Sequence, residues 1–188
     1  MLKDLILKNR SYRRFYQDEV ISIDILRDLV DLARLSPSAR NAQPLKYLLV
    51  NTPDINDKIF PHLSWAGYLK NWAGPEKGEQ PSAYIVVLND TDISANYFCD
   101  DGIATQSILL GAVEKGLGGC IIGSLNRLKL QRELKLSDKL KIVHVIALGK
   151  PKEDVVIEQM KENNIKYWRD VHQKHHVPKR NLDDIIIS

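Results

Sequence analysis

The feature that most constrains the fold is an almost unbroken apolar run, Ala83-Tyr84-Ile85-Val86-Val87-Leu88. A strand with one solvated face alternates polar and apolar residues, whereas a strand without alternation is buried on both faces. The chain must therefore place other elements on both sides of this strand. At 188 residues it is long enough to do so within a single domain.

Other segments supply the covering elements. Apolar residues spaced three and four apart, together with capping residues such as Ser22, predict helices over about 2–9, 22–33, 53–60, 95–115 and 126–134. The 95–115 helix is apolar or small on nearly every side, which predicts that it is buried all round. Further strands are expected over 47–50, 119–122 and 141–148. Two glycines and two prolines make residues 71–81 a loop.

Composition excludes several classes of protein. The net charge of +3 is too small for a nucleic-acid binder, which normally shows a strong basic stripe. Cys99 and Cys120 are too few for a disulfide framework. No apolar run approaches the ~18 residues of a membrane span, and no signal peptide is apparent. A reducing cytoplasm is therefore the expected compartment.

Two motifs carry the chemistry. The first, Arg10-Ser11-Tyr12-Arg13-Arg14-Phe15, is dense in donors that suit phosphate oxygens. The second, Pro37-Ser38-Ala39-Arg40-Asn41-Ala42-Gln43-Pro44, is bracketed by prolines that restrict the backbone. Its amides and polar side chains could hydrogen-bond a flat polar heterocycle.

As a pair, these motifs resemble the nitroreductase family of FMN-dependent oxidoreductases, which carries Arg-Ser-x-Arg-x-Phe and, one helix later, Pro-Ser-x-x-Asn-x-Gln-Pro. The resemblance covers residues 2–150 well. It implies an α+β fold with a mostly antiparallel sheet flanked by helices, in an intertwined homodimer. It also implies a single domain, residues 1–188, whose C-terminal arm, residues 151–188, packs on the partner subunit and adds an edge strand there.

The resemblance also assigns roles to residues. Arg10 and Ser11 would face the phosphate and ribityl end of FMN, and Arg13 the pyrimidine end of the ring. The proline-bracketed loop would reach the cofactor across the dimer interface, and the backbone after the 119–122 strand would point at flavin N5. The implied cofactor-binding set is Arg10, Ser11, Arg13, Pro37, Ser38, Ala39, Asn41, Gln43, Ile122, Gly123, Lys179 and Arg180.

Simpler interpretations stay open for each motif. The arginines could form a solvated basic face, the loop could satisfy its own backbone, and Gly123 could simply end a strand. The glycines at 116–119 do not make a dinucleotide-binding fingerprint, because Ile121 stands where a third glycine is needed and a helix precedes them. We further expect Arg14 at the surface, Cys120 inert, and Trp65, Tyr68, Trp72 and Trp168 in the core or an interface, with Trp65 to Trp72 lining the pocket as the alternative.

The implied activity is electron transfer from NADH or NADPH through FMN to a small flat acceptor, such as a nitroaromatic or a quinone, by a ping-pong mechanism. No catalytic triad or carboxylate pair is apparent, which agrees with a cofactor that does the chemistry. A zinc site is not expected from His172, His175 and His176, since no second ligand cluster lies near them. The alternatives are an FMN-binding storage or sensing protein without turnover, and a specialised reductase such as a dehalogenase on the same scaffold.

Overall fold

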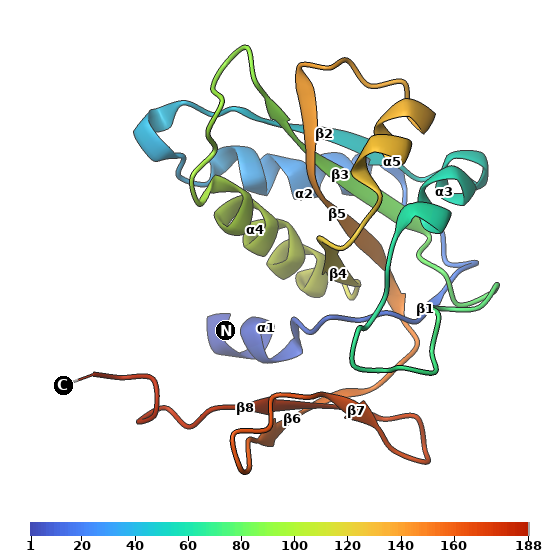
Figure 1. Cartoon of the computed structure of the whole chain (residues 1–188), viewed down its shortest axis with the longest axis vertical. Coiled ribbons are helices and arrows are strands. Elements are labelled where there is room, and N and C mark those ends of the chain that lie inside the picture. The colour runs from blue at the N-terminus through green and yellow to red at the C-terminus, as the bar shows by residue number, and fades with distance from the viewer. Residues whose placement is uncertain (188) are drawn as a thin grey trace.

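A five-stranded antiparallel sheet forms the body of the protein in the computed structural model, which describes residues 1–187 (Figure 1). The strands follow the order β1-β5-β3-β2, and β4 also pairs with β5. Every pairing within this sheet is antiparallel, which agrees with the mostly antiparallel sheet that the family resemblance implied. The strands are β1 (Phe15–Tyr16), β2 (Leu45–Val50), β3 (Ala83–Asp90), β4 (Gly118–Ile122) and β5 (Leu140–Pro151).

Helices cover both faces of this sheet. α2 (Ile23–Leu35) and α4 (Asp100–Glu114) pack on one face, against Ala83, Ile85 and Val87 of β3. α3 (Pro53–Ile59), the short turn η2 (Phe60–His62) and α5 (Arg127–Glu133) pack on the other, against Tyr84, Val86 and Leu88. Successive residues of β3 thus enter two separate apolar cores, which explains why the run has no polar alternation.

Local signals fix where the helices begin and end. Ser22 caps α2 by accepting a hydrogen bond from the backbone of Ile25, and Asn126 caps α5 in the same way. Pro53 begins α3 at a position where its missing N–H costs nothing. Gly116 follows α4 with a φ of 73°, the left-handed conformation that glycine adopts freely. Each of these boundaries agrees with the sequence analysis.

Three expectations about the body need correction. α4 begins at Asp100 rather than near residue 95. The backbone N–H groups of Asn96 and Phe98 donate hydrogen bonds to side-chain oxygens two residues earlier, which favours a turn over a helix there. The helix is also not buried all round: Ile103 is 36% exposed and Gln106 is exposed. Two strands run longer than expected, since β2 and β5 both extend past the predicted ranges.

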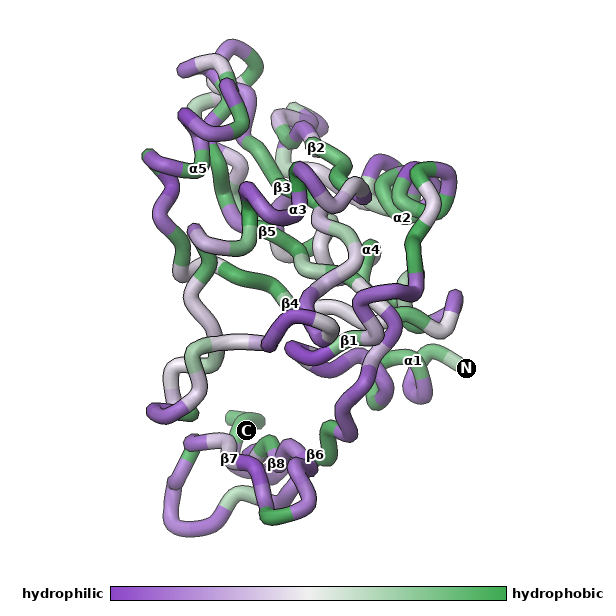
Figure 2. The backbone as a smooth tube through the Cα atoms, turned by 90° about the vertical axis from the view of Figure 1, so that its right-hand side faces the viewer, coloured by the Kyte–Doolittle hydropathy of each residue, from purple (hydrophilic) through white to green (hydrophobic). Residues whose placement is uncertain are grey.

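The arm forms a second sheet of its own, which the sequence did not predict. Its strands are β6 (Val155–Gln159), β7 (Trp168–Arg169) and β8 (His175–Lys179), in the order β6-β8-β7, with β6 and β8 parallel. Figure 2 shows this mostly hydrophilic sheet set apart from the body, and in Figure 1 α1 (Leu2–Lys8) lies between the two. Packing of the arm on a second subunit stays a prediction. Within residues 1–187, no helix has the length and apolar character required to cross a bilayer.

Candidate functional site

The segment after α1 lies along β4 and lines a pocket of about 310 Å³. Ser11 forms a bridge with Gly119, and the backbone N–H of Tyr12 donates to the Gly119 carbonyl at 3.1 Å. A Cβ atom at Gly118 would stand 2.5 Å from the Tyr12 ring, so glycine is required for this approach. We call this the arginine pocket; its lining is Asn9, Arg10, Ser11, Arg13, Gln106, Leu109, Gly119, Ile121, Tyr167, Val177 and Lys179.

The arginine pocket is rich in unused cationic donors. Arg10 donates from Nη2 to the Ile6 carbonyl at 2.7 Å, while its buried Nε has no hydrogen-bond partner within residues 1–187. Arg13 donates from Nη1 to the Ser11 carbonyl at 3.1 Å, and its guanidinium lies 5.1 Å from the centre of the Tyr167 ring. A guanidinium has five N–H donors, so both arginines keep donors free for an anion. Lys179 brings a third cation from β8.

A smaller hollow of about 150 Å³ adjoins the arginine pocket and shares Arg13 and Ile121 with it. We call it the glycine pocket, because Gly123 lines it and no atom lies within 4 Å of where a Cβ there would stand. The rest of the lining is Ser64, Trp65, Ala66, Gly67, Cys120, Ile122 and Ser124. Trp65 therefore lines the pocket, whereas Trp72 does not. Burial raises the pKa of the Cys120 thiol, which keeps it protonated at neutral pH.

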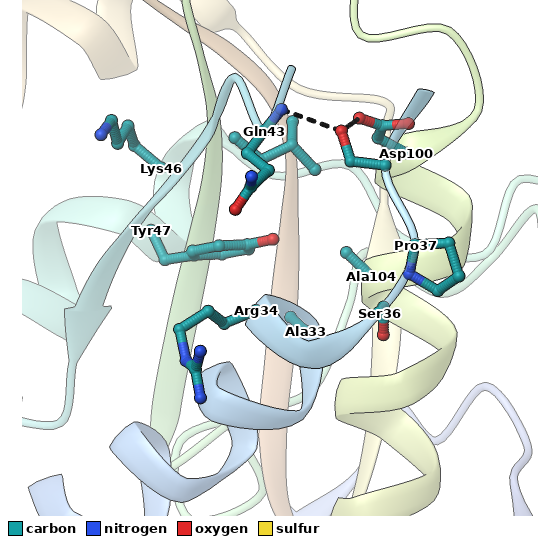
Figure 3. Close-up of a pocket in the computed structure, with 11 residues that line it drawn as sticks. Ala33, Arg34, Ser36, Pro37, Gln43, Lys46, Tyr47, Asp100 and Ala104 are labelled. Carbon is teal, nitrogen blue, oxygen red and sulfur yellow. Dashed lines mark hydrogen bonds between the residues drawn. The ribbon is translucent and has the colours of Figure 1, made fainter. Parts of the chain in front are cut away.

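The proline-bracketed loop lines a third hollow of about 220 Å³, the loop pocket, between α2, β2 and α4 (Figure 3). Asp100, the first residue of α4, accepts hydrogen bonds from the Ser38 hydroxyl at 2.5 Å and from the Ala39 backbone N–H at 2.8 Å. The Ser38 hydroxyl also accepts from the backbone N–H of Gln43 at 2.9 Å. Tyr47 points from β2 towards Ala104 of α4, and burial raises its pKa to about 12.

The loop holds a strained but well-bonded conformation. Arg40, Asn41 and Gln43 all have left-handed backbone angles, with φ between 50° and 55°. The side-chain amide of Gln43 donates to Oδ1 of Asn41 at 3.1 Å. The loop thus satisfies much of its own hydrogen bonding, while its strain is held in place by Asp100. Such over-determined strain is common at binding sites.

Within one chain, the predicted site residues fall into three groups. Arg10, Ser11, Arg13 and Lys179 line one pocket, and Ile122 and Gly123 line the hollow beside it. Pro37, Ser38 and Gln43 line the separate loop pocket, which shares no lining residue with the other two; Ala39 and Asn41 belong to the same loop. Arg180 lines none of these pockets, and its Nη1 donates to Oδ1 of Asn163 at 3.0 Å.

Sequence reasoning missed two neighbours of the site. Arg14 is not a free surface residue: its side chain is only 20% exposed and donates twice to Glu79, at 2.5 and 2.7 Å. These hydrogen bonds lower the pKa of Glu79 to about 2. Tyr167 lines the arginine pocket from the arm. Glu79 lies 65 positions from Arg14 and Tyr167 follows a polar tract, so neither contact had a local signal.

The three C-terminal histidines lie in different surroundings. His175 is fully buried, His172 is exposed, and His176 lies between Glu158 and Asp170, at 2.7 and 3.3 Å. The two carboxylates raise the pKa of His176. Across the described residues, no group of three or more His, Cys, Asp or Glu is arranged to hold a metal ion.

Similarity to known proteins identifies the family. The model of the nitroreductase family matches residues 6–150. This chain belongs to the nitroreductase family. An oxygen-insensitive NADPH nitroreductase of Helicobacter acinonychis is 25% identical to it over 204 residues, covering 86% of this chain and 93% of the relative.

Solved structures of the nitroreductase family share the fold. A family member from Clostridium novyi superposes with a TM-score of 0.67 at 28% identity, covering 81% of this chain and 86% of that one. An FMN-dependent nitroreductase from Clostridium difficile superposes with a TM-score of 0.62 at 22% identity, covering 85% and 90%. The predicted family, the α+β nitroreductase fold and the assignment as an oxidoreductase enzyme are thereby confirmed.

Proposed function

We propose that this nitroreductase family member binds FMN in the arginine and glycine pockets, takes reducing equivalents from NADH or NADPH, and passes them to a small flat acceptor such as a nitroaromatic or a quinone. The observation that carries the proposal is the convergence of Arg10, Arg13 and Lys179 on one pocket with donors to spare. The FMN dependence of the Clostridium difficile relative supports the choice of cofactor.

The residues present fit FMN. Its phosphate is an anion that suits Arg10, Ser11 and Lys179, since arginine forks and ammonium groups neutralise phosphate oxygens. The open space over Gly123 in the adjoining pocket leaves room for a planar ring close to the backbone. Bound FMN would supply the transfer of a hydride to and from its ring.

This chain's own residues would orient the ring and tune its charge. Arg13 lines both pockets and would lie beside the ring, where a fixed cation stabilises the negative charge that reduction creates. Trp65 forms an apolar wall of the glycine pocket and limits access of water to it. The sequence carries no dinucleotide-binding fingerprint, so both substrates would use the same face of the ring in turn.

We also propose that the working unit is a homodimer in which the loop around Ser38, Asn41 and Gln43 serves the site of the partner subunit. The loop pocket is separate from the arginine pocket in one chain, so the loop is free to face a second copy. Exposed apolar side chains support association: Ile103, Ile121, Leu182, Ile185, Ile186 and Ile187 are each at least 36% exposed.

The deciding experiment is rapid-mixing reduction of the purified protein. We expect one FMN per subunit and rapid bleaching of its yellow colour under anaerobic NADH or NADPH. Varying donor and acceptor together should give parallel double-reciprocal lines, and the activity should survive EDTA. Absence of bound flavin after soaking in FMN would refute the proposal. A flavin that binds but is not bleached would indicate storage or sensing instead.

A further inference from the structure

A buried ionic cluster joins the arm to the body beside the arginine pocket. Glu153 follows β5, and its side chain has no solvent exposure. Its Oε1 accepts a hydrogen bond from the backbone N–H of Arg13, and its Oε2 accepts one from Nη2 of Arg169 at 2.8 Å. One carboxylate therefore connects the segment that carries Arg13 to strand β7.

Aromatic contacts extend this connection to the loop after η2. The Arg169 guanidinium lies 4.2 Å from the ring centre of Trp72. Two residues earlier, the Tyr167 ring lies 4.9 Å from that of Tyr68, while its other neighbours include the guanidinium of Arg13. Arg169 of β7 and Tyr167 just before it thus contact both the Arg13 segment and the 68–72 loop.

The charge balance of the cluster depends on Arg169. His175 is fully buried with its Nδ1 3.9 Å from Glu153 Oε2, but burial and the nearby Arg13 and Arg169 lower its pKa to about 4. At neutral pH it is uncharged, so Arg169 is the cation that contacts the carboxylate. A buried ion pair seldom adds net stability compared with apolar residues of similar volume. The Glu153–Arg169 pair is better explained by the segments that it holds together, the Arg13 segment and β7.

We propose that Glu153 is a positioning residue for the arginine pocket: its carboxylate fixes the backbone at Arg13 and ties β7 to it, so that Arg13, Tyr167 and Lys179 face one ligand. That this ligand is FMN rests on the proposed function. Without the acceptor, the partly buried Arg13 amide would have no hydrogen-bond partner, which is unfavourable. The segment would then turn to find another acceptor and move the guanidinium away from the pocket.

A matched pair of double variants tests the acceptor alone. E153Q/R169M and E153L/R169M both remove the two charges together, so neither leaves an unpaired buried charge. Met is flexible and can pack on Trp72 in place of the guanidinium. The two variants differ in the side-chain amide: Gln keeps an oxygen that can accept from the Arg13 N–H, whereas Leu has no polar atom. Titration of the apoprotein with FMN, followed by flavin fluorescence, measures the affinity.

We expect E153Q/R169M to bind FMN within about threefold of the unmodified protein, and E153L/R169M to bind roughly tenfold more weakly. E158Q is the control, since Glu158 is an arm carboxylate that contacts His176 and not Arg13; its affinity should not change. Equal FMN affinities for the two double variants would overturn the proposal. If E153L/R169M does not fold, E153M/R169M removes the acceptor with a more adaptable side chain.

Amide hydrogen exchange at Arg13 in the FMN-free proteins gives a second readout that does not depend on the cofactor. Exchange should be slow in the unmodified protein and in E153Q/R169M, and at least about tenfold faster in E153L/R169M. Equal exchange rates in the two double variants would also overturn the positioning role. If the unmodified protein binds no FMN, the proposed function fails, while hydrogen exchange still decides the role of Glu153.

Discussion

The body sheet and the arm sheet are held together by different forces. All six residues from Ala83 to Leu88 are at most 3% exposed, and each packs into one of two apolar cores. Among the described residues 152–187, by contrast, only Glu153 and His175 are buried, and both are polar. Burial of apolar area is non-directional and largely independent of pH, whereas buried polar contacts depend on charge and geometry.

This difference matters because the arginine pocket lies where the two sheets meet. Arg10 and Arg13 come from the body, whereas Tyr167, Val177 and Lys179 come from the arm. The body can therefore stay folded while the pocket loses one of its walls. Local opening at a free energy below that of global unfolding is common for segments with few apolar contacts.

The largest effect is expected from a cavity in the body. Ile108 of α4 is fully buried in the core between the sheet and α2, so Ile108→Ala should lower the free energy of unfolding by about 2–5 kcal/mol. Urea unfolding measures this loss. Leu128→Ala on α5, where the side chain is 72% exposed, should cost much less. Equal losses would show that the core does not dominate the stability of the body.

Mild acid should loosen the arm before it affects the body. The pKa of His175 is about 4 when folded against an ordinary value of 6.5, so its stabilising contribution is complete above pH 6.5 and is lost as pH falls from 6.5 to 4. The loss should reach on the order of 2 kcal/mol by pH 5. Arg13 and Arg169 oppose protonation of His175, whereas Glu153 favours it. The pKa of His176 is raised, so protonation of His176 stabilises the fold instead of weakening it.

Hydrogen exchange of the β8 amides at pH 7, 6 and 5 measures this loosening. His175→Phe should flatten the pH dependence, because the buried ring can no longer take up a proton. His172→Ala is the matched control, since that side chain is exposed. Arm protection that stays constant from pH 7 to pH 5, or an unchanged profile in His175→Phe, would contradict this prediction.

A smaller effect should separate two adjacent cations of the arm. Lys179 lines the arginine pocket and Arg180 does not. We expect Lys179→Ala to weaken FMN binding by roughly three- to tenfold, the range of a partly solvated charge on a phosphate, and Arg180→Ala to change it by less than about twofold. Fluorescence titration measures both affinities. A larger loss of affinity in Arg180→Ala than in Lys179→Ala would show that the phosphate contact belongs to Arg180 and not to Lys179.

The smallest effect should come from a surface charge on the body. Lys139 and Asp92 form an ion pair at 2.5 Å, with side chains that are 65% and 57% exposed. Lys139→Ala should change the free energy of unfolding by about 0.5 kcal/mol or less, because exposed pairs are screened by water and salt. A clear loss in urea unfolding would mean that surface charge also supports the body.

The sequence predicted the body because its signals are local. The apolar run of β3, the cap at Ser22 and the proline at the start of α3 each act within a few residues. The arm lacked such signals, since β7 is two residues long and β6 and β8 carry no regular alternation. Contacts such as that of Arg13 with Glu153, 140 positions away, depend on the tertiary fold and leave no pattern in the chain.

The candidate site divides in the same way. The motifs at Arg10 and Pro37 could be recognised from the sequence because they resemble those of a known family. The structure adds that Lys179, and not Arg180, lines the arginine pocket. The tie between Ser38 and Asp100, 62 positions apart, could not be read from either segment alone. Arg14 was misjudged for the same reason, because its partner Glu79 lies in a loop.

The arginine pocket also has a consequence for the order of events during protein synthesis. Arg10 and Lys179 line the same pocket but lie 169 positions apart, 179 minus 10. A ribosome adding about 5–20 residues per second reaches Lys179 roughly 8–34 s after Arg10. The body strands can pair during that interval, whereas the pocket is complete only once β8 has emerged. Tight retention of an anionic ligand here therefore reports that the chain has been translated through its arm.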